Sequence, residues 1–307
     1  MRRALILILA LCLLPLAGVR AGEDLLDGLY HYTLLPDGTA KITGYDGVGP
    51  TLDIPSALGG HPVAVIGSRA FYRNGNLVTL DIPQGVTVLE DQAFADCAGA
   101  ETAALPDSLV SIGGAAFANC RSLCSVNLPE SLSFIGDFAF YRCESLESVV
   151  VPQKVPAIGK SAFQECGALQ MAELPEGLLS IGDHAFWRCG ALDEINFPAA
   201  LTELGDFSFG MCESLREAAI PAGVSVIPNG AFKRCKSLSR VTLPQGLREI
   251  RGDAFTGCES LTSLVIPASV TFIRPRTFSG SDSLTLTVAP GSAAEAFCLE
   301  YGLPFTH

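Results

Sequence analysis

The sequence predicts a repeat solenoid built from 23-residue coils with short parallel β-strands. A proline recurs at intervals of 23 residues from Pro83 to Pro290. A phenylalanine stands 11 residues after each proline from Pro83 to Pro267, and a cysteine stands 14 residues after each proline up to Pro244. A fixed period of about 20–29 residues with regular apolar positions is typical of a solenoid, because a single coil buries its apolar side only against its neighbours.

Residues 1–21 are predicted to be a secretory signal peptide. Arg2 and Arg3 precede an apolar run over residues 4–16, and Val19-Arg20-Ala21 offers a cleavage site. The run is shorter than the about 20 residues that cross a bilayer. We therefore expect a secreted protein, with or without retention at the cell surface, and no stable membrane insertion of the mature chain; an uncleaved anchor is the alternative.

The mature chain is acidic. The full sequence has 20 Lys+Arg and 32 Asp+Glu, and removal of Arg2, Arg3 and Arg20 leaves 17 against 32, a net charge of −15 with His neutral. This charge disfavours nucleic acid and anionic membranes as partners.

Residues 22–53 are expected to form an N-terminal β-hairpin cap, because β-prone runs at 29–34 and 39–43 flank an Asp-Gly turn. The solenoid is expected over 54–290. Its first coil carries five extra residues around 58–62, which we expect to loop out.

A C-terminal helical cap is expected over 291–307. Ser292 is suited to be its N-cap and Gly302 to follow its last turn. Such caps cover the apolar ends of a solenoid.

Within a coil, a short strand is expected near Val126–Leu128, in parallel with Val149–Val151 of the next coil. A second extended piece is expected near 132–135. A tight helical turn is expected from Asp137 to Phe140, next to Gly136.

The eight cysteines in register could form a metal array, a series of disulfides or a row of core thiols. Zinc ligands normally include cysteines two to four residues apart, whereas these are 23 apart. A row of equivalent thiols offers no preferred disulfide partner. Asn74 and Ser281 occupy the same position in other coils, which predicts a small buried polar group that hydrogen-bonds the turn backbone.

The pattern Pro-x2-Leu-x2-Ile-Gly-x2-Ala-Phe-x2-Cys-x2-Leu-x2-Val-x-Leu resembles the BspA-type leucine-rich repeat family of bacterial surface and secreted proteins. The resemblance covers about residues 54–290 and implies a leucine-rich-repeat type solenoid. It also implies a non-catalytic adhesion or protein-binding role towards an extracellular protein or glycoprotein ligand. The alternative is a structural or assembly component of a cell-envelope matrix.

We expect no catalytic residues, no cofactor and no metal, and we expect a monomer. The sequence contains no His-Glu-x2-His, Gly-x-Ser-x-Gly or phosphate-loop motif. The four histidines lie far apart in the chain, at His31, His61, His184 and His307.

Two exposed stripes are candidates for partner binding. The first flanks the inward strand residues and carries charges, namely Glu147, Glu173, Asp193, Glu194, Arg216, Glu217 and Arg240. The second follows the phenylalanine row and consists of Tyr72-Arg73, Tyr141-Arg142, Trp187-Arg188 and Lys233-Arg234. Trp, Tyr and Arg are the usual anchors of interfaces, so we expect Trp187 to contribute to binding and little to stability. The alternatives are an ordinary solvated face for the first stripe and local packing over the next coil for the second.

Overall fold

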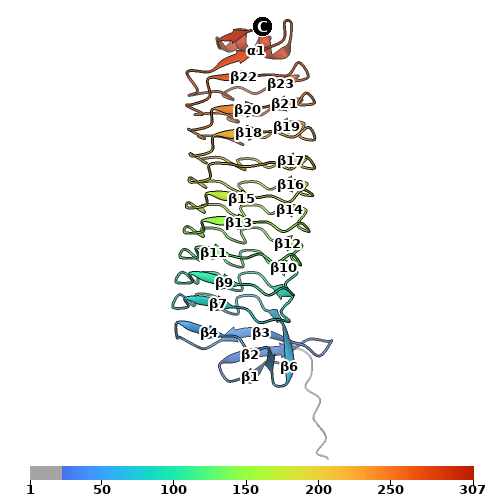
Figure 1. The fold of residues 1–307 in the computed structure, drawn as a ribbon, viewed down its shortest axis with the longest axis vertical. Coiled ribbons are helices and arrows are strands. Elements are labelled where there is room, and N and C mark those ends of the chain that lie inside the picture. Colours follow the sequence, from blue (N-terminus) through green and yellow to red (C-terminus); the bar gives the residue numbers. More distant parts are fainter. Residues whose placement is uncertain (1–22) are drawn as a thin grey trace, which may run out of the picture.

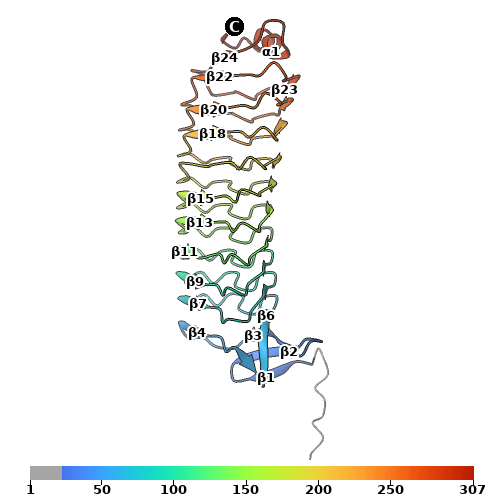
Figure 2. The ribbon, with the colours of Figure 1, turned by 45° about the vertical axis from the view of Figure 1, so that its right-hand side comes forward.

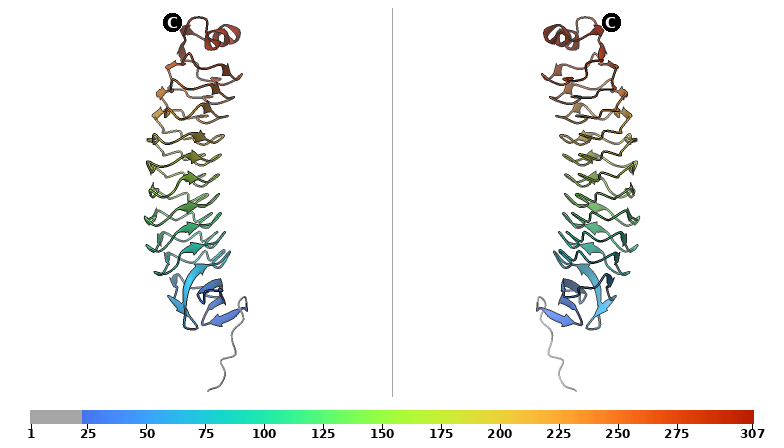
Figure 3. Two further views of the ribbon diagram at one scale, coloured as in Figure 1. Left: turned by 90° about the vertical axis from the view of Figure 1, so that its right-hand side faces the viewer. Right: turned by 90° about the vertical axis from the view of Figure 1, so that its left-hand side faces the viewer.

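The computed structural model describes residues 23–307 and shows a long column of stacked coils (Figure 1). The column runs from a group of strands at the N-terminal end to a helix at the C-terminal end, and the side views show the same stacking (Figure 3). The expected signal peptide lies outside the described residues. Within residues 23–307, no helix is long and apolar enough to cross a bilayer.

The N-terminal cap contains the predicted hairpin and one further strand. β2 (Tyr30–Leu34) and β3 (Ala40–Tyr45) pair antiparallel, and β1 (Leu25–Asp27) adds to the free edge of β2. Asp37 holds the hairpin turn, because its Oδ1 accepts hydrogen bonds from the backbone N–H and the hydroxyl of Thr39. β3 then pairs in parallel with β6 (His61–Ile66), so the cap continues into a solenoid sheet.

The five extra residues of the first coil, which were expected to loop out, lie in a short hairpin. β5 (Ala57–Leu58) pairs antiparallel with the start of β6. Gly59 and Gly60 connect them with φ of 54° and 82°. Two left-handed residues in succession match the twist of a two-residue hairpin turn, and glycine adopts them without steric cost.

Two ladders of short strands run along the column, and they appear on opposite sides in Figure 2. The first ladder precedes the prolines and contains β4 (Thr51–Asp53), β7 (Thr79–Asp81), β9 (Thr102–Ala104), β11 (Ser125–Val126), β13 (Ser148–Val150), β15 (Met171–Glu173), β18 (Glu217–Ala219), β20 (Arg240–Thr242), β22 (Ser263–Val265) and β24 (Thr285–Thr287). The second contains β6, β8 (Val88–Leu89), β10 (Ser111–Ile112), β12 (Phe134–Ile135), β14 (Ala157–Ile158), β16 (Ser180–Ile181), β17 (Glu203–Leu204), β19 (Val226–Ile227), β21 (Glu249–Ile250) and β23 (Phe272–Ile273). Pairing within both is parallel and joins equivalent residues of neighbouring coils, as in Ser148 with Met171. The predicted parallel strands are therefore confirmed.

The strands stack in parallel as predicted, but hydrogen bonding is interrupted in both ladders, in the second between β12 and β14 and between β17 and β19. β11 pairs with β9 and not with β13, and β20 does not pair with β22. Between β15 and β18, the intervening coil contributes a single parallel bridge, from Met171 to Glu194. The coils remain stacked across these gaps because the turn segment carries its own ladder of hydrogen bonds.

This turn is not the tight helical turn that the sequence predicts. Phe138 and Arg142 have left-handed backbones, with φ of 60° and 57°. The N–H groups of Phe138, Phe140 and Arg142 donate to carbonyls of the next coil at 2.8 Å, while the amides between them bond within the turn. Every second amide of the turn therefore points along the column, with left-handed residues at the first and last of these three positions. The hydrogen bond offsets the cost of left-handed backbone, which is about 1–2 kcal/mol for a residue with a side chain.

The core is a stack of ten phenylalanine rings from Phe71 to Phe278. Successive ring centroids are 4.9–5.9 Å apart and the ring planes lie within 11° of each other. Beside the stack, each in-register cysteine donates its Sγ–H to the carbonyl of a phenylalanine one coil back, as in Cys189 to Phe163 at 3.1 Å. Ser281 makes the same bond to Phe255 at 2.9 Å. The predicted hydrogen bond to the turn backbone is confirmed, and the ten described cysteines are free thiols.

The C-terminal cap is the predicted short helix, α1 (Ala293–Tyr301). The Ser292 hydroxyl accepts the Glu295 N–H at 3.2 Å, and Gly302 ends the helix with a φ of 66°. After it, β25 (Phe305–Thr306), which the sequence does not predict, pairs with β24 and covers the last strand of the first ladder. Phe297 packs edge-on against Phe278 and so closes the ring stack.

Candidate functional site

The face of the first ladder bears a hollow of about 610 Å³ between β15 and the equivalent segment of the next coil. We call it the acidic hollow. Its lining consists of Gln170, Met171, Ala172, Glu173, Leu174, Glu176, Asp193, Glu194, Asn196, Phe197, Pro198 and Ala199. The side chains of β15 that face it, Met171 and Glu173, are exposed, whereas Ala172 between them points into the core.

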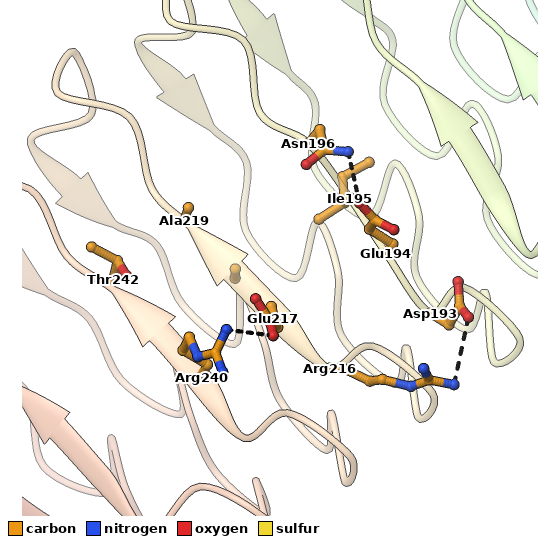
Figure 4. Close-up of a pocket in the computed structure, with 10 residues that line it drawn as sticks. Asp193, Glu194, Ile195, Asn196, Arg216, Glu217, Ala219, Arg240 and Thr242 are labelled. Atoms are coloured by element: carbon orange, nitrogen blue, oxygen red, sulfur yellow. Dashed lines mark hydrogen bonds and ion pairs between the residues drawn. The ribbon is translucent and has the colours of Figure 1, made fainter.

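A second hollow of about 380 Å³ lies on the other side of the same segment, towards β18 and β20 (Figure 4). We call it the paired hollow. Its lining consists of Asp193, Glu194, Ile195, Asn196, Arg216, Glu217, Ala218, Ala219, Arg240 and Thr242. Asp193 and Glu194 thus border both hollows.

The segment between the two hollows has bulky side chains at positions 195 and 197. Ile195 points into the core where the two neighbouring coils have Ala172 and Ala218. Phe197 lies edge-on against Phe209, with ring centroids 5.3 Å apart. Both side chains belong to the coil whose strand-face contact with β15 is reduced to one bridge, from Met171 to Glu194.

The two hollows differ in their charges. In the paired hollow, Arg240 Nη1 lies 2.7 Å from a Glu217 oxygen and Arg216 Nη2 lies 3.6 Å from Asp193. Neither lysine nor arginine lines the acidic hollow. Among residues 23–307, neither Glu173 nor Glu176 has a cation within 4.0 Å.

Glu194 has only a polar neighbour in this region. Its carboxylate accepts a hydrogen bond from the Asn196 side-chain amide at 2.9 Å, as Figure 4 shows. The acidic hollow therefore carries negative charge that the protein itself leaves largely uncompensated. Such a surface attracts cations.

The aromatic and basic candidates lie along the turns that follow the phenylalanine row, which we call the turn edge. Contacts between neighbouring coils occupy most of their charges. Arg142 Nε lies 2.9 Å from Glu165, and Lys233 Nζ lies 2.7 Å from Asp253. More loosely, Arg188 lies 3.7 Å from Glu165.

The first pair of the turn edge also makes local contacts. The guanidinium of Arg73 stacks over the Tyr72 ring, 5.0 Å from its centroid, and its Nε lies 3.8 Å from Asp96. Arg142 is placed similarly over Tyr141, at 5.8 Å. The arginines of all four pairs have left-handed backbones. The turn geometry therefore fixes the position and direction of the Cα–Cβ bond of each arginine.

Trp187 packs on the next coil. Its ring lies edge-on against Phe207, with centroids 5.5 Å apart, and near His184 at 5.7 Å. It covers Gly210, where an added Cβ would collide with the indole. The side chain is half-buried. The expectation that Trp187 contributes little to stability therefore does not fit its environment.

The structure thus divides the predicted site residues into two groups. Glu173, Asp193, Glu194 and Glu217 come together around the two hollows. The other eight, namely Tyr72, Arg73, Tyr141, Arg142, Trp187, Arg188, Lys233 and Arg234, line neither hollow. Sequence reasoning missed Met171, Glu176 and Phe197. Met171 could have been found, because its position holds Thr or Ser in the four preceding coils.

The eight in-register cysteines, which we call the thiol row, are poor candidates for reactive site residues. Burial raises the pKa of Cys97 and Cys258 to about 12, and it raises the pKa of the thiols between them as well. A reactive cysteine needs a thiolate, so a raised pKa makes these thiols inert at neutral pH. Across residues 23–307, no three or more His, Cys, Asp or Glu side chains lie close enough together to hold a metal ion.

The stacked 23-residue coils and their short parallel strands define a leucine-rich-repeat solenoid. The model of the BspA type leucine rich repeat region matches residues 64–189 and 157–285. The protein therefore belongs to the BspA-type leucine-rich repeat family. A comparison with curated proteins found no match.

Two solved structures share the architecture. A leucine rich cell surface protein from Faecalibacterium prausnitzii A2-165 is 25% identical, with a TM-score of 0.57 over 91% of this chain and 97% of that one. The pneumococcal vaccine antigen PcpA is 20% identical, with a TM-score of 0.55 over 88% of this chain and 82% of its own. The second likeness concerns the fold alone.

Proposed function

We propose that this protein is a secreted, non-catalytic protein-binding or adhesion module whose ligand is an extracellular protein or glycoprotein. The observation that carries the proposal is the pair of hollows on the strand face, where Glu173, Asp193, Glu194 and Glu217 meet. Membership of the BspA-type family supports a binding role. The ligand docks on the strand face, while the turn edge holds the coils in register.

The experiment is a binding measurement on the secreted chain, residues 22–307, by biolayer interferometry. Purified mucins and extracellular-matrix glycoproteins serve as analytes. For an analyte that binds, the double variant Glu173→Gln/Glu194→Gln should weaken affinity at least tenfold. A turn-edge variant, Arg142→Gln, is the matched control and should bind as the parent protein does.

Two outcomes contradict the proposal. If none of the analytes binds with a dissociation constant below the millimolar range, the adhesion role fails. If Arg142→Gln abolishes binding while the strand-face variant retains it, the docking face is wrong and the turn edge is the site.

A structural role in a cell-envelope matrix predicts a different behaviour. A matrix component associates with further copies of itself at micromolar concentration. Sedimentation velocity from 1 to 100 μM separates the two functions, because a binding module of this kind stays monomeric over that range.

A further inference from the structure

We infer that the acidic hollow receives a lysine or arginine side chain from an extended, basic segment of the ligand protein. This inference rests on the proposed function and adds the chemistry of the contact. It assigns the cation-binding role to the acidic hollow and not to its neighbour, the paired hollow.

The shape of the acidic hollow suits a long side chain with a charged end. Its apolar lining includes Met171, whose side chain is 46% exposed, together with the half-buried Phe197. Lysine and arginine pack their aliphatic stems on apolar surface while the charged group stays near water. Val150 extends the apolar surface on the neighbouring strand β13 and is 50% exposed.

The charges of the acidic hollow suit the end of such a side chain. Carboxylates approach from two neighbouring coils, Glu173 and Glu176 from one and Asp193 and Glu194 from the next. In the described part of the chain, no lysine or arginine lines the hollow, and of its four carboxylates only Asp193 has a cation within 4.0 Å, Arg216 on the side of the paired hollow. A carboxylate pairs well with a guanidinium or ammonium group, and the hydrogen bonds are stronger than those between neutral groups.

The charges of the paired hollow explain why we place the bound lysine or arginine in the acidic hollow only. It contains a similar number of carboxylates, but Arg240 and Arg216 already lie against Glu217 and Asp193. A basic ligand would have to displace these arginines before it could bind there. The two hollows therefore occupy similar positions on the strand face but differ in how much of their negative charge is free to bind a basic ligand.

A methionine methyl group provides a direct reporter. Apart from Met1, the chain has only Met171, in the acidic hollow, and Met211, on the turn edge. The secreted chain is labelled with [methyl-¹³C]methionine and titrated with the peptide acetyl-Gly-Ser-Lys-Leu-Arg-Leu-Lys-Ser-Gly-amide. The control peptide has acetyl-lysine for each lysine and citrulline for arginine, so it keeps the stems and loses the charge.

The Met171 methyl signal should shift and saturate with the basic peptide, while the Met211 signal stays in place. The neutral peptide should bind at least tenfold more weakly. An equal response to both peptides, or no shift of Met171 at accessible peptide concentrations, overturns the inference.

Variants localise the effect. Glu173→Gln/Glu176→Gln should weaken binding of the basic peptide at least tenfold, because it removes two of the three carboxylates in the acidic hollow that have no cation within 4.0 Å among residues 23–307. Glu217→Gln, in the paired hollow, should leave the affinity within twofold. Unchanged affinity in the first variant contradicts the inference, and Trp187 fluorescence checks that both variants are folded.

The outcome is separable from the proposed function. A glycoprotein that still binds Glu173→Gln/Glu176→Gln with full affinity leaves the adhesion role intact and refutes the cation-binding role. Conversely, a basic peptide that shifts Met171 in a protein that binds no glycoprotein supports the hollow and refutes the wider function.

Discussion

The strand face and the turn edge both carry charged residues but differ in how these are paired. On the turn edge, Arg142 and Lys233 lie within 3 Å of carboxylates on neighbouring turns, at 2.9 and 2.7 Å. In the acidic hollow, Glu173 and Glu176 have no such partner among the described residues. On the turn edge, charges of neighbouring coils therefore neutralise one another. In the acidic hollow, charge and apolar surface are left for another molecule.

The largest expected effect concerns the thiol row that supports the turn edge. Unfolded thiols ionise near their ordinary pKa of 9.0, whereas burial raises the folded pKa to about 12 for Cys97 and Cys258. Above pH 9 the unfolded state therefore binds fewer protons than the folded state. Stability should be complete below pH 9 and fall by up to about 1.4 kcal/mol per pH unit for each thiol.

Urea unfolding at pH 7 to 10.5, followed by Trp187 fluorescence under reducing conditions, measures this slope. Cys189→Ser should make the decrease of the unfolding free energy with pH less steep by the contribution of one thiol. The serine should be tolerated, since Ser281 already makes the equivalent hydrogen bond. A free energy of unfolding that stays constant from pH 8 to pH 10.5 would show that the thiols are not buried in this way.

The next effect separates the core from the turn edge within one region of the column. Phe163→Ala should destabilise the protein by about 3–5 kcal/mol, because it removes a fully buried ring from the stack. Phe138→Ala, at a side chain that is 37% exposed, should cost clearly less. Chemical denaturation compares the two variants, and equal losses would contradict the described core.

Substitutions of Trp187 and Met171 compare how much the turn edge and the strand face contribute to stability. Trp187→Ala should cost about 1–3 kcal/mol, since an aromatic pair contributes roughly 0.5–1.5 kcal/mol beyond its buried area and Trp187 contacts both Phe207 and His184. Met171→Ala should change stability by no more than about 0.5 kcal/mol, as exposed substitutions usually do. Thermal unfolding by circular dichroism measures both. A neutral Trp187→Ala would instead favour the turn edge as a binding surface.

The smallest effect concerns two hydroxyls at one repeat position. Ser208 and Thr277 replace the alanine that precedes the core phenylalanine elsewhere. Thr277 donates to carbonyls of the turn, whereas the buried Ser208 hydroxyl has no partner. Ser208→Ala should therefore stabilise the protein by about 1 kcal/mol, and Thr277→Val should destabilise it by a similar amount. Denaturant midpoints would contradict this reading if both substitutions shifted stability in the same direction.

The fold was largely predictable because the 23-residue period determines which residues stack in neighbouring coils. Stacking at 23 residues places Phe, Cys and the strand residues in rows, and Ser292 and Gly302 bound the final helix. The left-handed turns were not predictable, because Phe138 or His184 carries no signal for positive φ. Hydrogen bonds to the next coil impose that conformation, and they exist only once the coils are stacked.

The candidate site was predictable only in part. Charges such as Glu173 and Glu217 mark the strand face, but their spacing does not show which ones find a partner. That depends on which side chains of neighbouring coils come within reach of each other, which is a property of packing between coils. The same limit left two alternatives for Trp187, binding to a partner and packing over the next coil.

Hydrogen–deuterium exchange on residues 22–307, with and without a bound glycoprotein, tests the choice of surface most directly. Ligand binding should slow exchange in peptides covering 170–177 and 193–199, on both sides of the acidic hollow. Peptides covering 184–188, 207–211 and 230–234 should exchange at unchanged rates. The reverse pattern, with protection confined to the turn edge, would contradict the account.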